Sequence, residues 1–148
     1  MTNDEYLLAA LRLATGNDPI PGHVSRAARE AFGLRIPRVV TASPVESGQG
    51  CEVRESEGES VLRFKSDDVT LDLELSVSDG LIDVAGEIAP HPGDDSHVDI
   101  RTPNMTLTRR LIGSGQFAVT GMPPGWFDVV CHRPGHPPIA TPWIRVRP

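Results

Sequence analysis

The sequence has few residues that would give it a basic surface or cross-link it. Lys65 is its only lysine, and 14 basic against 20 acidic residues give a net charge of −6. Proteins that bind nucleic acids normally need a basic surface patch, so no nucleic-acid partner is expected. The two cysteines, Cys51 and Cys131, are too few for a disulfide framework. We interpret them as half-buried thiols in a reducing cytosol, although one bridge between two strands stays open.

Long apolar runs are also missing. No stretch approaches the roughly 20 apolar residues that a membrane-spanning helix needs. The first residues, MTNDEYLLAALRLATG, are acidic where a signal peptide would carry basic residues. The sequence therefore predicts a cytoplasmic protein with no membrane partner.

Glycine and proline, in contrast, are abundant, with 14 residues of each in 148. Such a composition favours many short strands joined by turns. A chain of this length buries roughly two thirds of its unfolded surface on folding, so it needs neither a metal nor a disulfide to be stable.

Residues 1–33 are predicted to form a helical extension with two helices. In NDEYLLAALRLAT, acidic residues follow a capping asparagine, and the helix is expected to end at Gly16 and Asn17. In DPIPGHVSRAAREAFG, the prolines suit the start of a second helix and Gly33 suits the position after its end. Each helix has an apolar stripe, which must cover either the rest of the protein or a partner.

Residues 34–50, LRIPRVVTASPVESGQG, are interpreted as a connector without regular structure throughout. From residue 51 to residue 148 the pattern changes to a period of two. In VTLDLELSV, for example, apolar residues 69, 71, 73, 75 and 77 alternate with polar ones. About nine short strands follow at regular spacing, which predicts a mainly β protein with an antiparallel, immunoglobulin-like or prealbumin-like β-sandwich.

The stretch GQFAVTGMPPGWFDVVCH, residues 115–132, has a clear structural interpretation. Phe117 and Val119 are expected to face the core, and the Pro-Pro-Gly turn then reverses the chain. Phe127, Val129 and Cys131 are expected to share the inner face of the next strand.

This order of residues resembles the G-x-F-x-x-x-G-x-P-x-G-x-(F/Y)-x-(L/V) signature of carboxypeptidase-regulatory-like, prealbumin-type domains. The resemblance extends over roughly residues 69–147 and includes GLIDVAGEIAPHPGDDSHVDIRT. It implies a sandwich that acts as an accessory or binding module. Hydrolases with a related fold carry a characteristic C-terminal tetrapeptide, whereas this chain ends in WIRVRP, so their activity is not expected here.

The whole chain also resembles a group of small bacterial proteins found near extracytoplasmic-function sigma factors. The matching pieces are NDEYLLAALRLA, NDPIPGHVSRAAREAF and ATPWIRV. The resemblance implies a regulatory role with a sigma factor or its regulator as protein partner. In residues 34–50 this chain departs from the group, whose members usually continue as a helix there.

Histidine and acidic residues gather in two segments without forming a recognisable metal motif. CHRPGH brings Cys131, His132 and His136 close in sequence, and His91 and His97 lie in another loop. Zinc sites usually need about four N or S ligands. Here no paired C-x-x-C exists, and alternation places Cys131 and His132 on opposite faces. In HPGDDSHVD, the acids Asp94, Asp95 and Asp99 do not follow the calcium-loop pattern, so a solvated loop is expected. No metal and no cofactor are predicted.

Catalytic motifs are equally absent from the sequence. It has no G-x-S-x-G elbow, and Gly113-Ser114-Gly115 lacks the Lys-Ser/Thr of a phosphate-binding loop. Asp67 and Asp68 are explained by solvation at a turn. We therefore predict no catalytic residues and no enzyme activity.

The residues most suited to binding a protein partner are apolar or aromatic. Trp143 is interpreted either as a core residue or as part of a recognition surface. The helical stripes either pack on the sandwich or bind a partner. The candidate partner-binding residues are Leu7, Leu8, Leu11, Val24, Ala28, Phe32 and Trp143.

The sequence thus predicts a non-enzymatic regulatory or protein-interaction protein. The alternative is an accessory module that recognises a carbohydrate or a peptide through its loops. The identity of the partner and the oligomeric state do not follow from the residues.

Overall fold

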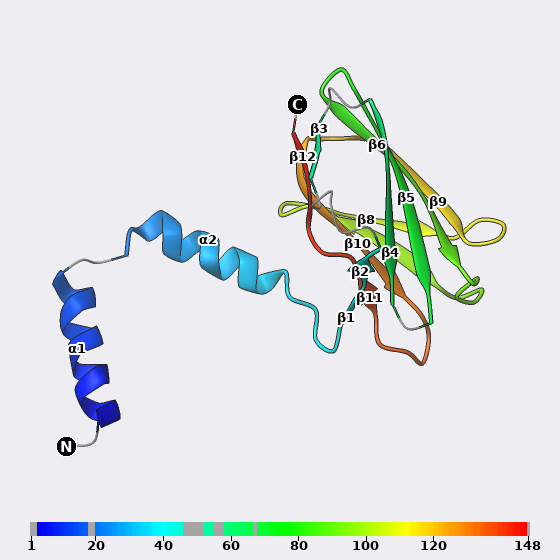
Figure 1. Ribbon diagram of the computed structural model, residues 1–148. Coiled ribbons are helices and arrows are strands. Elements are labelled where there is room, and N and C mark those ends of the chain that lie inside the picture. The colour runs from blue at the N-terminus through cyan, green and yellow to red at the C-terminus, as the bar shows by residue number, and fades with distance from the viewer. Residues whose placement is uncertain (1–2, 18–19, 46–51, 55–57, 67, 148) are drawn as a thin grey trace. The chain divides into compact units, whose positions relative to one another are not determined.

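A computed structural model describes residues 3–17, 20–45, 52–54, 58–66 and 68–147 (Figure 1). Its contacts divide the chain into two compact units, residues 1–35 and residues 36–148. The first unit is helical and the second is built from two sheets. The prediction of a mainly β protein with a short N-terminal helical pair is therefore confirmed.

The helical unit contains α1 (Asn3–Asn17) and α2 (Gly22–Gly33). Asp4 and Glu5 lie in the first turn of α1, as predicted, where acidic side chains favour the positive end of the helix dipole. Pro21 precedes α2 with φ −54°, a value that suits a helix start. Within the described part of the chain, neither helix combines the length and the apolar character that crossing a membrane requires.

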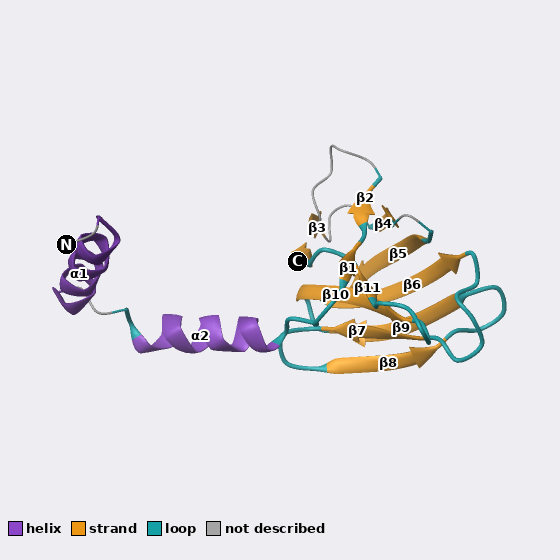
Figure 2. Ribbon diagram, turned by 90° about the horizontal axis from the view of Figure 1, so that it is seen from below, coloured by secondary structure: helices purple, strands orange, loops and turns teal. Residues whose placement is uncertain are grey.

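The second unit is a β-sandwich (Figure 2). One sheet has five strands, which pair in an antiparallel manner in the order β2 (Ser43–Pro44), β4 (Glu59–Lys65), β5 (Thr70–Ser78), β6 (Leu81–Ala89) and β9 (Gln116–Met122). The other sheet has seven strands: β1 (Val40–Thr41), β3 (Glu52–Arg54), β7 (His97–Arg101), β8 (Thr106–Arg110), β10 (Gly125–His132), β11 (Ile139–Ala140) and β12 (Ile144–Arg147).

Strand β10 is the centre of the seven-stranded sheet. Its residues 128–132 pair with β7 on one side, and it pairs with β11 and β12 on the other. All these pairs are antiparallel, but β1 pairs with β11 and β3 with β12 in parallel. The described residues thus contain 12 strands rather than about nine, because short segments that pair only briefly also join the sheets.

The connector expected at residues 34–50 is more ordered than its sequence indicates. Its residues 40–44 supply β1 to the seven-stranded sheet and β2 to the five-stranded sheet. The N–H of Val40 donates to the carbonyl of Pro138 at 2.8 Å, and the N–H of Ala42 donates to the carbonyl of Ala140 at 2.8 Å. Backbone pairing of this kind needs no apolar periodicity, so the sequence pattern did not reveal it. Residues 46–50 lie outside the described residues.

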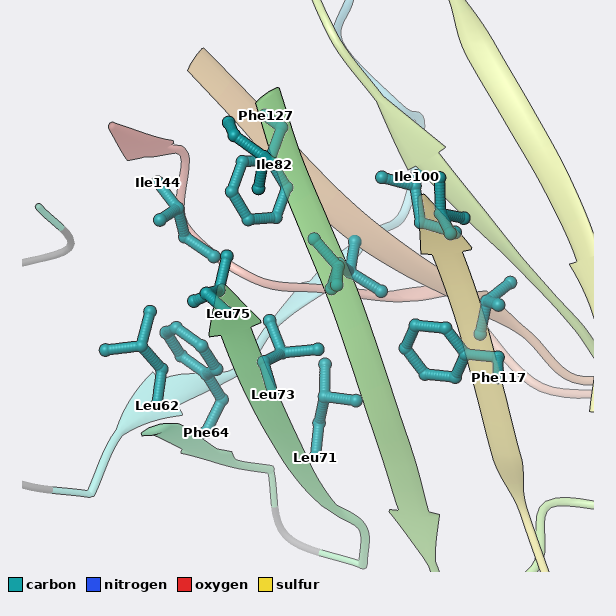
Figure 3. Packing of buried hydrophobic residues seen from close by; sticks show 14 of the residues in the cluster. Leu62, Phe64, Leu71, Leu73, Leu75, Ile82, Ile100, Phe117, Phe127 and Ile144 are labelled. Carbon is teal, nitrogen blue, oxygen red and sulfur yellow. The ribbon is translucent and has the colours of Figure 1, made fainter. Parts of the chain in front are cut away.

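The core lies between the two sheets (Figure 3). The alternation predicted for residues 69–77 is confirmed, since each of its odd-numbered apolar side chains is buried. Phe64, Leu73 and Phe117 enter this core from the five-stranded sheet, while Ile100 and Phe127 enter it from the seven-stranded sheet. A core of this kind fixes which face of each strand remains on the outside.

The stretch 115–132 also behaves largely as predicted. Gly115 has a φ of +120°, and a Cβ atom there would lie 2.3 Å from the carbonyl oxygen of Ile88, so a side chain does not fit. The inward positions of Phe117, Phe127 and Cys131 are confirmed. One detail differs from the expectation: β9 and β10 belong to different sheets, so the Pro-Pro turn carries the chain across the sandwich instead of closing a hairpin.

Candidate functional site

The outer face of β7 and β10 carries several ionisable side chains in close register. In the register of these strands, His97 lies opposite His132, and Arg101 lies opposite Asp128. The alternate residues of both strands, such as Ile100 and Val129, point into the core. The remaining residues of β7 and β10 therefore share one outer surface.

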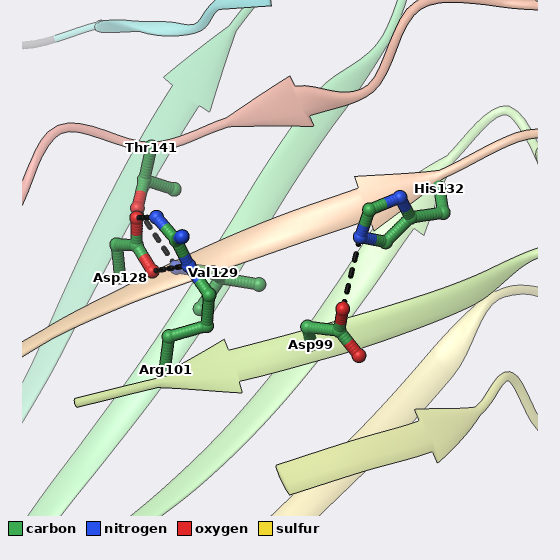
Figure 4. Close-up of polar contacts among 6 residues, drawn as sticks. All are labelled: Asp99, Arg101, Asp128, Val129, His132 and Thr141. Carbon is green, nitrogen blue, oxygen red and sulfur yellow. Dashed lines mark hydrogen bonds and ion pairs between the residues drawn. The ribbon is translucent and has the colours of Figure 1, made fainter. Parts of the chain in front are cut away.

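Three of these side chains form what we call the His97–Asp99–His132 cluster. The Nε2 atom of His132 lies 2.9 Å from Oδ2 of Asp99 (Figure 4). The rings of His97 and His132 are stacked, with centroids 4.7 Å apart and planes inclined by 15°. The other oxygen of Asp99, Oδ1, accepts a hydrogen bond of 2.7 Å from the hydroxyl of Thr108 on β8. Each of the three residues has one nitrogen or oxygen atom that could bind a metal ion, and these three atoms lie within 4.8 Å of one another.

A buried ion pair lies farther along the same two strands. Nε of Arg101 donates to Oδ1 of Asp128 at 2.9 Å, and Nη2 of Arg101 donates to Oδ2, so the contact is bidentate (Figure 4). The side chains are only 13% and 3% exposed. Burial raises the pKa of Asp128 above its ordinary value, and the Arg101 guanidinium opposes this shift.

Trp143, one of the predicted binding residues, lies beside this ion pair. The guanidinium carbon of Arg101 is 5.4 Å from the centre of the Trp143 ring, a cation–π contact. The indole is half-buried and does not belong to the cluster of core residues between the sheets. The structure therefore places Trp143 at an ordered polar surface.

The six predicted binding residues of the helices lie on α1 (Leu7, Leu8, Leu11) and on α2 (Val24, Ala28, Phe32). Their side chains are exposed, from 46% for Val24 to 69% for Phe32 among the large ones. None of the described side chains of α1 and α2 belongs to the buried core. The helical stripes and Trp143 belong to different units of the chain.

The cysteine and histidine residues that the sequence groups together are separated by the fold. Cys131 is a buried free thiol in the core, and burial raises its pKa to about 11, so it is a poor nucleophile and a poor ligand. His91 and His136 lie in exposed loops. Cys51 lies outside the described residues. Only His97, Asp99 and His132 meet, and among the described residues no other set of three such side chains does.

The sequence contained part of the signal for this cluster. In His-Val-Asp, residues 97–99, alternation places His97 and Asp99 on one face of a strand. The third member, His132, follows only from the pairing of β7 with β10, which no local pattern specifies.

A groove of about 480 Å³ lies on the outer face of the five-stranded sheet. Its floor includes the small side chains of Ala85 and Ala118, which are direct neighbours on β6 and β9. Val61 and Ile112 provide apolar walls and are 69% and 70% exposed. Acidic and amide side chains also line the groove: Asp72, Glu74, Glu87 and Gln116.

No protein-family model, no curated protein and no solved structure matches this chain. The resemblance to prealbumin-type domains, and to the sigma-factor-associated group, therefore rests on the sequence motifs alone.

Proposed function

We propose that this chain is a non-enzymatic, cytoplasmic protein that binds a partner protein through the apolar faces of α1 and α2. The observation that carries the proposal is that nothing within the described part of the helical unit covers these faces, whose large side chains are from 46% exposed for Val24 to 69% exposed for Phe32. Exposed apolar side chains that gather on one face mark an interaction surface more often than isolated ones do.

The spacing of these residues suits a helix that binds in a groove. Leu7 and Leu11 are four residues apart, and so are Val24 and Ala28. Helices that bind apolar grooves use anchors at such intervals. Helices of 15 and 12 residues are at most marginally stable alone, so a surface that covers the apolar face also stabilises the helix.

The partner class follows from the second resemblance described above. A sigma factor, or a protein that regulates one, is the partner that this resemblance implies. The role of the chain is then regulatory: the helices occupy an apolar groove on that partner, while the sandwich provides a stable body.

The experiment is affinity purification of the full-length protein from its native host, with the proteins that accompany it identified. Two variants are compared, Phe32→Ser on the apolar face of α2 and Arg29→Ser, which the helical pattern places on its polar face. We expect a stoichiometric regulator with the wild type and with Arg29→Ser, and its loss with Phe32→Ser, because of these two side chains only that of Phe32 lies on the apolar face.

A second measurement separates partner binding from packing on the sandwich. If α2 packs on the protein itself, Phe32→Ser should lower the melting temperature by several degrees, since it then removes buried apolar area. An unchanged melting temperature together with lost capture supports partner binding. A lower melting temperature, with no partner captured by any version, would refute the proposal.

The groove on the five-stranded sheet favours a second candidate function, recognition of a short peptide or a carbohydrate. Its small floor residues and its ring of carboxylates and one amide suit a polar ligand. Ligands that bind only the folded state raise the melting temperature. A saccharide or peptide that does so in the wild type, but not in Ala118→Arg, would identify this groove as its site.

A further inference from the structure

We propose that the His97–Asp99–His132 cluster binds one zinc ion. Two imidazoles and one carboxylate are among the side chains that zinc prefers, and three protein ligands are what zinc sites with an exchangeable position use. The three donor atoms come from two paired strands and lie within 4.8 Å of one another. This inference concerns the sandwich and is independent of the role proposed for the helices.

Two of the three ligands are already at nearly the right separation. His132 Nε2 and Asp99 Oδ2 are 2.9 Å apart. Two ligands at bond lengths of about 2.0–2.1 Å in tetrahedral geometry lie roughly 3.3 Å apart. The ion therefore takes the place of the proton between these two atoms, and the side chains separate by only a few tenths of an ångström.

His97 completes the set through rotation of its side chain. Its ring lies directly against that of His132, 4.7 Å between centroids, because the two residues are opposite each other in the register of β7 and β10. Both side chains are partly exposed rather than locked in the core. The backbone does not need to move, since strand pairing already holds the three Cα atoms in place.

The contacts of Asp99 hold its carboxylate in an orientation that suits a metal ligand. Thr108 donates to Oδ1, which fixes the carboxylate and leaves Oδ2 directed at His132. Outer contacts of this kind orient metal ligands in known sites.

The proposed ion has access from solvent and an open coordination position. The side chains of His132 and Asp99 are 33% and 18% exposed. Three ligands leave the fourth position of a tetrahedral ion to water or to a donor atom from another molecule. Closed structural sites, in contrast, use four protein ligands.

The test uses the full-length protein with its purification tag removed. Zinc affinity is measured in competition with a chromophoric chelator, and cobalt(II) replaces zinc to give a visible spectrum that reports the ligands. The variants are His97→Ala, His132→Ala and Asp99→Asn. The matched controls are His91→Ala and His136→Ala, two exposed loop histidines outside the cluster.

We expect one zinc ion per chain in the wild type and in both controls. Loss of an outer-shell partner typically costs about 10–100-fold in metal affinity, so loss of His97 or His132 should cost more than about 100-fold. Thr108 acts as a positioning residue. Thr108→Val should weaken zinc binding about 10-fold without changing the cobalt spectrum, and Thr108→Ser should restore it.

One further variant distinguishes a loss of zinc binding from a loss of the folded structure. His132→Gln keeps a side-chain amide that can donate to Asp99 but is a poor zinc ligand, and its fold is checked by circular dichroism and by melting in the absence of metal. A folded His132→Gln with lost affinity supports the site. Undiminished zinc affinity in His132→Gln and His97→Ala, or no saturable binding by the wild type, would overturn the proposal.

Discussion

Two bidentate arginine–aspartate pairs among the described residues of the sandwich have the same chemistry in opposite surroundings. On the five-stranded sheet, Arg63 donates to Asp72 at 2.6 and 3.0 Å, with side chains 59% and 39% exposed. On the seven-stranded sheet, Arg101 and Asp128 are 13% and 3% exposed. The first pair lies on a face open to water, and the second lies on an outer face whose residues are only partly exposed.

An inner strand of each sheet, β6 in one and β10 in the other, shows the same contrast. Along β6 the residues alternate strictly between exposed and buried, so its outer face is in contact with solvent. Along β10, five consecutive residues from Phe127 to Cys131 are buried, so both of its faces are covered. Polar groups on β10 therefore need partners, and Arg101 provides one for Asp128.

The largest effect that this comparison predicts is the removal of Arg101. Arg101→Met leaves the Asp128 carboxylate buried without its partner, and breaking a buried pair in this way costs about 3–4 kcal/mol of unfolding free energy. The double variant Arg101→Met/Asp128→Leu should recover most of the loss, because well-packed apolar residues often replace a buried pair at little cost. Urea unfolding at neutral pH measures both. A loss below about 1 kcal/mol for Arg101→Met would show that the outer face of β10 is in effect solvated.

The inner face of β10 gives a prediction of intermediate size. Burial raises the pKa of Cys131 from 9.0 to about 11. As the pH rises, the unfolded chain therefore loses the thiol proton before the folded protein does. The stabilisation of the folded protein that comes from this thiol is complete below pH 9 and is lost toward pH 11. A difference of two pKa units between the unfolded and the folded state corresponds to about 2–3 kcal/mol of unfolding free energy.

The control for this thiol is Cys131→Ala, in which that component of the pH dependence is missing. Unfolding free energies of both proteins are measured from pH 8 to pH 11, and the decline of the wild type should be steeper. Parallel curves would mean that the Cys131 thiol is accessible to water in the folded protein.

The smallest effect is expected for the exposed pair. Arg63→Met should change the unfolding free energy by less than about 1 kcal/mol, because water screens the pair and compensates for the lost contact. The same urea experiment as for Arg101→Met applies, so the two substitutions are directly matched. Equal losses at Arg63 and Arg101 would remove the distinction between the two outer faces.

Much of the fold could be predicted from the sequence because its causes are local. The alternation of residues 69–77 predicts which side chains enter the core, and Gly115 marks a position where a side chain does not fit. The helix ends near Asn17 and Gly33 follow from glycine and asparagine. The β1 and β2 pairings could not be predicted, since brief backbone pairing leaves no periodic pattern.

The candidate sites divide in the same way. The apolar stripes of the helices are visible in the spacing of Leu7, Leu11, Val24 and Ala28. In the sequence, however, the neighbours of His132 are Cys131 and His136, whereas the fold brings His132 to His97 and Asp99. Residues next to each other on a strand point to opposite faces, so sequence neighbours are often not spatial partners.

By itself, the amino-acid sequence determined the two kinds of secondary structure, the inward face of the strands and the turns that separate them, because these depend on period, on glycine and on proline. Only the tertiary structure decided which strands are neighbours and in which register. That register places His97 opposite His132 and Arg101 opposite Asp128. It is set by how two sheets pack around one core, a property of the whole chain that no local segment contains.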